Sequence, residues 1–282
     1  MTHLDEMILG FRQALAQGNT QEIIPQIYGL SYLQDRGVYP LLLPLIKDPE
    51  LGDETVKALA NLNDSRALFP LLQFFSQTAS AALHQRVLQY CYATGDPRAV
   101  DFLEAYLQDP SKPFQDIANT ALSQCRETSP FHYRFCGTNE DHQRSLSASG
   151  RILVTLEDLD QSTNLLIENK RDRDQEVPQT YIVTPELEMY LGGTLNEHVQ
   201  VAQGSDVLAA GEVELKRIEE AWQITYLNNR SNSYYPAGNS FAWVQKALEH
   251  SGVILEQDKF SEIFPRDGFA DAEFLDLFAI KD

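Results

Sequence analysis

The chain has 282 residues, of which 43% are hydrophobic and 22% are charged, a usage typical of globular proteins. With 41 acidic and 22 basic residues its formal net charge is −19, and the isoelectric point lies near 4.6. A field of this sign repels phosphate backbones, so the composition argues against nucleic-acid binding and favours a cationic partner. Solubility alone would also explain the charge, and both interpretations stay open.

The chain shows no pattern of membrane insertion or secretion. No run approaches the ~18 apolar residues that a membrane-spanning helix needs. The first residues, MTHLDEM, are acidic and lack the basic and apolar regions of a signal peptide. Cys91, Cys125 and Cys136 are odd in number and lack metal-ligand spacing, so we expect reduced thiols; a disulfide between Cys125 and Cys136 is the alternative. These features predict a cytoplasmic protein without a membrane partner, a bound metal or a cofactor.

Three turns in the first half of the chain repeat one pattern. Each carries an Asp and an Arg before an apolar helical stretch: LQDRGVYPLLLPLIKDP, LNDSRALFPLLQFF and TGDPRAVDFLEAYLQDP. Arg36, Arg66 and Arg98 are 30 and 32 residues apart. An Asp precedes each Arg, where its side chain can cap the next helix: Asp35, Asp64 and Asp96. A repeat of this length is typical of stacked helical hairpins.

The segments between these turns carry buried helical faces. Val56, Leu59 and Leu62 follow the i, i+3 spacing of such a face, and proline at positions 49 and 110 ends the preceding helices. Residues 20 to 127 resemble the short HEAT-like repeats that also occur in phycobilin-lyase-type helical proteins. The resemblance implies an all-α HEAT-like solenoid over residues 1–127. It favours protein binding or domain packing over chromophore chemistry.

Residues 128–150 interrupt this periodicity and are expected to form a linker that partly docks on a domain. The stretch mixes turn formers with aromatic residues. His132, Cys136 and His142 lie in it, but they lack the spacing and the fourth ligand of a zinc site.

Residues 151–282 predict an α+β domain with a mainly antiparallel sheet. The predicted strands are RILVTL, NLLIENK, QTYIVT and LEMYLG, followed by a hairpin of DVLAAGEVELKRI and AWQITYLNN. The stretch FAWVQKALEHSG is an amphipathic helix that ends at Gly252. A last strand or docking segment is expected at Phe260, Ile263 and Phe264, and the acidic tail GFADAEFLDLFAIKD predicts a short helix.

Residues 181–244 carry the most distinctive pattern. It consists of YIVTPELEMYLGG, then NEHVQVAQGSDVLAAGEVEL, then ITYLNNRSNSYYP and a helix. This order resembles a poorly characterised bacterial module with relatives in polymorphic-toxin-associated proteins and in plant IQ-motif calmodulin-binding proteins. The chain departs from the module where Val199 and Gln200 follow His198 in place of a serine. It departs again where Asn232 and Ser233 replace Gly-His.

This pattern supplies the candidate binding residues: His198, Glu212, Asn229, Ser231, Tyr234 and Tyr235. His198, Glu212 and Tyr234 could line a pocket as hydrogen-bond donors or acceptors. Structural explanations compete at every position. Gly211 within a strand indicates a bulge or a close approach of main chains, and the asparagines and serines suit a polar turn. Tyrosine rings suit the edge of a core.

The sequence therefore predicts a protein-binding or regulatory protein that uses an acidic solenoid and an α+β domain to hold a protein partner, expected to be basic. An immunity or antitoxin-like role fits the acidity and the resemblance. The alternative is an enzyme that acts on a nucleotide or a protein, with a polar pocket at which His198, Glu212 and Tyr234 converge. A passive structural subunit is a third hypothesis. No catalytic residue is assigned.

Overall fold

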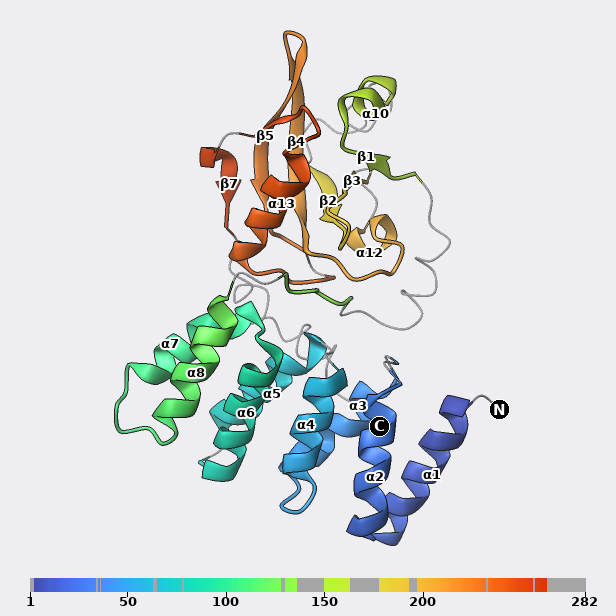
Figure 1. Cartoon of the computed structure of the whole chain (residues 1–282), viewed down its shortest axis with the longest axis vertical. Coiled ribbons are helices and arrows are strands. Elements are labelled where there is room, and N and C mark those ends of the chain that lie inside the picture. The colour runs from blue at the N-terminus through green and yellow to red at the C-terminus, as the bar shows by residue number, and fades with distance from the viewer. Residues whose placement is uncertain are drawn as a thin grey trace. The chain divides into compact units, whose positions relative to one another are not determined.

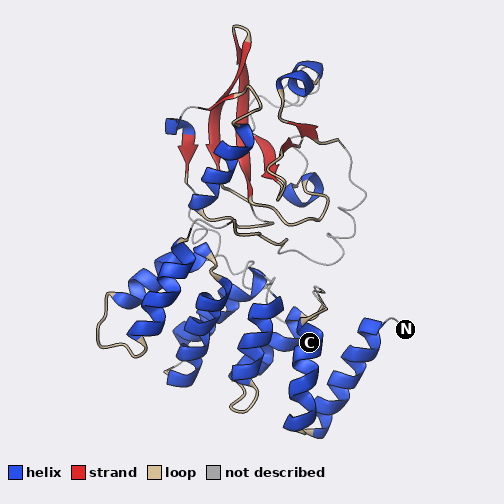
Figure 2. Ribbon diagram, viewed as in Figure 1, coloured by secondary structure: helices blue, strands red, loops and turns tan. Residues whose placement is uncertain are grey.

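The computed structural model describes residues 3–33, 35, 37–62, 65–77, 79–127, 130–135, 150–162, 178–192, 197–231, 233–255 and 257–262. The described chain divides into two compact units, which we call unit 1 (residues 3–127) and unit 2 (residues 130–262). Unit 1 is helical and unit 2 carries a sheet with a few helices (Figures 1 and 2). A helical region followed by a sheet domain is thus the architecture of the chain.

Unit 1 is a series of helices arranged in two rows. Its elements are α1 (His3–Gln17), α2 (Thr20–Ser31), α3 (Tyr39–Leu42), η1 (Leu43–Lys47), α4 (Gly52–Leu62), η2 (Ser65–Ala67), α5 (Leu68–Gln77), α6 (Ala81–Thr94), η3 (Pro97–Ala99), α7 (Val100–Leu107) and α8 (Gln115–Arg126). Helices α2, α4, α6 and α8 pack one against the next in chain order, and α5 and α7 pack on α6 and α8 (Figure 1). No helix of the described chain is long and apolar enough to cross a membrane.

Short polar side chains define where the helices of unit 1 begin and end. Asn19 caps α2 and Ser80 caps α6, each by accepting a hydrogen bond from a main-chain amide of the first turn. Helix α6 ends at Gly95, whose φ of +61° suits a residue without a Cβ. Of the predicted capping aspartates, Asp96 accepts from the Arg98 amide at 3.0 Å, and Asp35 accepts from the Gly37 amide at 2.7 Å. Asp64 and Arg36 lie outside the described residues.

Cations stack on aromatic rings between successive turns of unit 1. The Arg66 guanidinium lies 4.6 Å from the centre of the Tyr39 ring, and that of Arg98 lies 4.9 Å from the Phe69 ring. In α7 the equivalent position, three residues after Arg98, is the exposed Asp101. The first two repeats therefore present a ring to the arginine that follows, whereas the last repeat presents a carboxylate to solvent.

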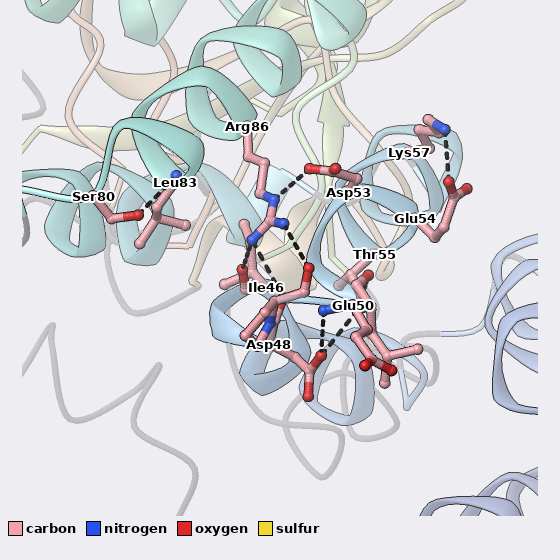
Figure 3. A network of polar contacts seen from close by, with 12 residues as sticks. Ile46, Asp48, Glu50, Asp53, Glu54, Thr55, Lys57, Ser80, Leu83 and Arg86 are labelled. Carbon is pink, nitrogen blue, oxygen red and sulfur yellow. Dashed lines mark hydrogen bonds and ion pairs between the residues drawn. The ribbon is translucent and has the colours of Figure 1, made fainter. Parts of the chain in front are cut away.

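Arg86 joins η1, α4 and α6 (Figure 3). Its side chain is only 7% exposed; it donates to the carbonyl oxygens of Ile46 at 3.2 Å and Asp48 at 3.3 Å, and it pairs with Asp53. A Cβ on Gly52 would lie 2.3 Å from Arg86 Nη1. The guanidinium thus adds donors to the carbonyls at the end of η1, and the absence of a side chain at Gly52 makes room for it.

Unit 2 is built on one sheet in the order β1-β3-β2-β4-β5-β6, with β7 also paired to β5. The strands are β1 (Ile152–Leu153), β2 (Gln179–Val183), β3 (Met189–Leu191), β4 (Ala209–Ile218), β5 (Ala221–Asn228), β6 (Ile254–Leu255) and β7 (Phe260–Ser261). The helices are α10 (Leu156–Gln161), α12 (His198–Val201), η4 (Gly238–Ser240), α13 (Phe241–Leu248) and η5 (Gln257–Lys259).

The sheet is mixed, where the sequence predicted a mainly antiparallel one. Pairings from β1 through β5 are antiparallel, but β6 and β7 both pair parallel with β5. Helix α13 carries the chain back along the sheet after β5, so the following strands run in the direction of β5. The predicted strand RILVTL is also shorter than expected, because Thr155 caps α10 by accepting from the Asp158 amide at 3.1 Å. NLLIENK, Ile263 and Phe264 lie outside the described residues.

The sheet buries a hydrophobic cluster on each side. Alternate residues of β4 face opposite ways: Ala209 and Val213 join a cluster with α13, and Ala210 joins a cluster with Val199 and Val201 of α12. We call the second side of the sheet the α12 face. Tyr133, from the stretch expected to be a linker, is buried in this second cluster and forms a β-bridge with Val207.

Candidate functional site

The main chain of β5 approaches β4 closely at Gly211. A Cβ at this position would lie 1.9 Å from the carbonyl oxygen of Asn228 and 2.9 Å from Cε1 of Tyr181. The Tyr181 hydroxyl donates to the same carbonyl at 2.9 Å. Of the two explanations that the sequence left open, the close approach of main chains therefore holds at Gly211, and the bulge lies further along, between Glu214 and Leu215.

Asn228 organises the polar groups beside Gly211. It is fully buried, and its Oδ1 accepts from the main-chain amides of Glu212 at 3.0 Å and Arg230 at 2.8 Å. Its Nδ2 donates to Glu212 Oε2 at 2.9 Å and to the Tyr226 hydroxyl at 2.8 Å. Both acceptor sites and both donor hydrogens of the amide are thereby used, which fixes the Glu212 carboxylate and the Tyr226 hydroxyl next to each other.

Two carboxylates share the α12 face with these groups. Glu212 and Glu214 alternate with inward-facing residues along β4, so their side chains lie on the same side, about 7 Å apart along the strand. Tyr226 pairs directly with Glu214 across the β4–β5 ladder and therefore lies on that side too. Neither carboxylate forms an ion pair with a residue that the structure describes.

His198 reaches the same strand from α12. Its Nε2 lies 2.9 Å from the Gly211 carbonyl oxygen, and because a carbonyl only accepts, Nε2 carries the proton. The ring is partly buried. Loss of water around it lowers the pKa of His198 to about 4, against the opposing effect of the Gly211 hydrogen bond. The imidazole is therefore neutral at pH 7.

The other predicted candidates stabilise the turn after β5. Tyr234 is fully buried and donates to the Ser205 carbonyl at 2.8 Å. Ser231 Oγ accepts from the Tyr234 amide at 3.3 Å, and the Ser231 carbonyl accepts from the Tyr235 amide at 3.0 Å. Asn229 donates to the Pro236 carbonyl at 2.9 Å. These bonds hold a polar turn together, as expected for asparagine and serine in such a stretch.

The structure thus separates the six candidates into two groups. Glu212 contacts Asn228 directly, and His198 is bonded to the residue before Glu212. The other four candidates form hydrogen bonds that stabilise the turn after β5: Asn229, Ser231, Tyr234 and Tyr235. Sequence reasoning missed Asn228 and Tyr226 as members of the site, because a buried asparagine at a strand end has the same local sequence as a turn asparagine.

The described chain holds no group of three or more His, Cys, Asp or Glu side chains suited to a metal ion. His132 is described, whereas Cys136 and His142 lie outside the described residues. Cys91 and Cys125 are buried free thiols, as expected for small apolar side chains. Burial raises the pKa of the Cys125 thiol to about 12 and that of Cys91 well above its usual value, which keeps both protonated.

No protein-family model matches the chain, and no significant match was found among curated proteins or solved structures. The two resemblances drawn from the sequence therefore remain predictions.

Proposed function

We propose that the protein is a regulatory protein that binds a basic protein partner through the α12 face of unit 2. One observation carries the proposal: Glu212 and Glu214 present carboxylates that form no ion pair with a described cation, with Tyr226 beside them. Lysine and arginine bind carboxylates through charge-assisted hydrogen bonds and also stack on tyrosine rings. Such a face suits a basic segment of a partner and repels an acidic one.

The hydrogen bond from Asn228 supports this proposal, because it fixes the orientation of the Glu212 carboxylate in the absence of a partner. A carboxylate held by a buried amide loses little freedom when a cation binds to it. Among the described residues the Glu212 carboxylate is bonded only through Oε2 to Asn228, so Oε1 can accept from an incoming guanidinium or ammonium group.

We also propose that unit 1 is a HEAT-like solenoid that itself contacts the protein partner. The row α2, α4, α6 and α8 supports this, as do the two stacks of an arginine on the ring of the preceding repeat. The exposed Asp101 suits the terminal repeat of such an array, which needs a polar outer side. An immunity or antitoxin-like role fits an acidic protein that binds a basic partner.

The alternative, an enzyme with a polar pocket in unit 2, would use His198 to move a proton. A pKa of about 4 makes the imidazole a weak base at pH 7. The Tyr234 hydroxyl donates to the Ser205 carbonyl, and Glu212 accepts from Asn228. These contacts favour binding over proton transfer.

Affinity purification from the native host tests the proposal. The full chain, the variant E212Q/E214Q and the control E220Q/E249Q are compared at moderate salt, and the retained proteins are quantified. We expect basic proteins on the wild type and on the control, and at least tenfold less of them on E212Q/E214Q. The proposal fails if no protein is retained specifically, or if the two double variants retain equal amounts.

A further inference from the structure

The turn between β2 and β3 holds a large apolar residue in an unfavourable main-chain conformation. The Leu187 amide donates to the Thr184 carbonyl at 3.0 Å, and the Thr184 amide donates to the Glu188 carbonyl at 2.9 Å. Leu187 has a φ of +64°, in the left-handed region. Glycine and asparagine adopt this region readily, whereas the Cβ of leucine crowds the following carbonyl oxygen.

Packing does not account for leucine at this position. The residue is 38% exposed, so its side chain is not enclosed by the core of unit 2. The other described non-glycine residues with positive φ are either polar or partly buried aromatic residues: Phe114, Gln203, Glu219 and Tyr235. Leu187 alone among them combines backbone strain with an exposed aliphatic side chain. A three-residue hairpin requires the left-handed conformation at this position but does not require leucine there, so a strained and exposed leucine points to a role outside the fold.

Acidic side chains flank Leu187 on both sides. Glu186 is exposed and forms no ion pair with a described residue. Glu188 is also exposed, and its Oε2 accepts from the Tyr190 hydroxyl at 2.8 Å. The Arg151 guanidinium stacks on the Tyr190 ring at 4.0 Å. The turn therefore presents one aliphatic side chain between two carboxylates.

We propose that the turn Thr184–Glu188 is a docking element whose Leu187 inserts into an apolar pocket of a protein partner, with Lys or Arg at the rim of that pocket. The acidic neighbours select a basic rim, and the apolar side chain requires an apolar floor. This inference rests on the proposed function, because the partner is the same basic protein. It assigns that partner a second contact, made by different residues from those of the α12 face.

Stability measurements give the first test, and they need no partner. Asparagine and glycine both tolerate a φ of +64°, so L187N should relieve strain and melt at or above the temperature of the wild type, and L187G should melt close to it. A melting temperature clearly below that of the wild type for both variants would show that Leu187 is needed for folding. That result would overturn the proposal whatever the binding data.

Binding gives the second test, with the matched control I218N, which removes another exposed aliphatic residue beside a hairpin turn. The wild type, L187N and I218N are each immobilised and compared for the proteins that they retain from an extract of the native host. The retained proteins are then eluted with a disulfide-cyclised peptide of residues 182–191 or with the same peptide carrying asparagine at the Leu187 position. We expect at least tenfold lower retention on L187N alone, and elution by the leucine peptide alone.

The two proposals fail in different ways. Equal retention on L187N and wild type, with loss on E212Q/E214Q, would overturn the docking turn and leave the α12 face standing. Loss on L187N, with full retention on E212Q/E214Q, would do the reverse. Elution by both peptides equally would also overturn the role of Leu187, and retention of no specific protein would overturn both proposals.

Discussion

The packing of the candidate site depends on the absence of a side chain at Gly211. The absence of a side chain allows the Asn228 carbonyl to approach β4, which places the Asn228 amide beside Glu212 and Tyr226 and leaves the Gly211 carbonyl for His198. The sequence predicted the close approach, because glycine inside a strand has few other uses. It could not predict Asn228, whose partner lies 16 residues away across a strand pair.

Substitution of Gly211 by alanine tests this packing. The new Cβ would lie 1.9 Å from the Asn228 oxygen, so β4 and β5 must separate. We expect the free energy of unfolding to fall by about 2–4 kcal/mol, as for other overpacked core positions. Urea denaturation measures it, with G10A in the middle of α1 as the control, where the new Cβ would approach only the end of the Gln26 side chain, at 3.3 Å. A loss below about 0.5 kcal/mol for G211A would contradict the observed approach.

His198 predicts a pH dependence of stability. Its pKa is lowered to about 4 in the folded state, against about 6.5 in the unfolded chain, so the unfolded chain binds more protons between these values. This contribution is fully present above pH 6.5 and is lost as the pH falls towards 4. Allowing for the partial exposure of the ring, we expect the wild type to lose about 2 kcal/mol more than H198Q between pH 7 and pH 4. Parallel pH profiles of the two proteins would contradict the shift.

The sequence predicted those helices and strands that a local pattern of residues determines. The repeated turns with Asp and Arg located the helices of unit 1, since caps and apolar spacing lie within a few residues of each other. Helix α10 was missed although Thr155 and Asp158 carry a capping pattern, because the preceding apolar run RILVTL indicated a strand. The parallel pairing of β6 and β7 depends on how α13 packs on the sheet, and no local pattern encodes that.

Arg86 links three elements of unit 1 and gives a prediction at this scale. R86M would remove the guanidinium donor from the Ile46 and Asp48 carbonyls and the ion-pair partner of Asp53, while the Asp48 carbonyl would keep the Gly52 amide as a donor. We expect a loss of about 1–3 kcal/mol in the free energy of unfolding, because buried carbonyls lose a donor, whereas the 66% exposed Asp53 carboxylate is solvated by water. The control is R126M: the Arg126 and Glu104 side chains pair on the surface and are 56% and 43% exposed. It should cost less than about 0.5 kcal/mol. Equal effects of the two variants would show that Arg86 does not bridge the elements as described.

The charge of the whole molecule is unevenly distributed. Residues up to position 128 contain 15 acidic and 9 basic side chains, and the rest of the chain contains 26 and 13. The larger excess of carboxylates therefore belongs to the part that carries the α12 face and the Leu187 turn. A field of this sign raises the rate at which a basic partner is captured, and added salt weakens it. We expect retention of the partner to fall steadily as the ionic strength rises.

Zero-length crosslinking tests the central claim most directly. A carbodiimide joins carboxylates to lysine amines only where the two are in contact, and mass spectrometry identifies the joined residues. With the partner retained from the native host, crosslinks should concentrate on Glu212 and Glu214, and fewer should form at Glu186 and Glu188. Crosslinks restricted to carboxylates of unit 1, such as Glu22 and Asp116, would contradict binding through the α12 face.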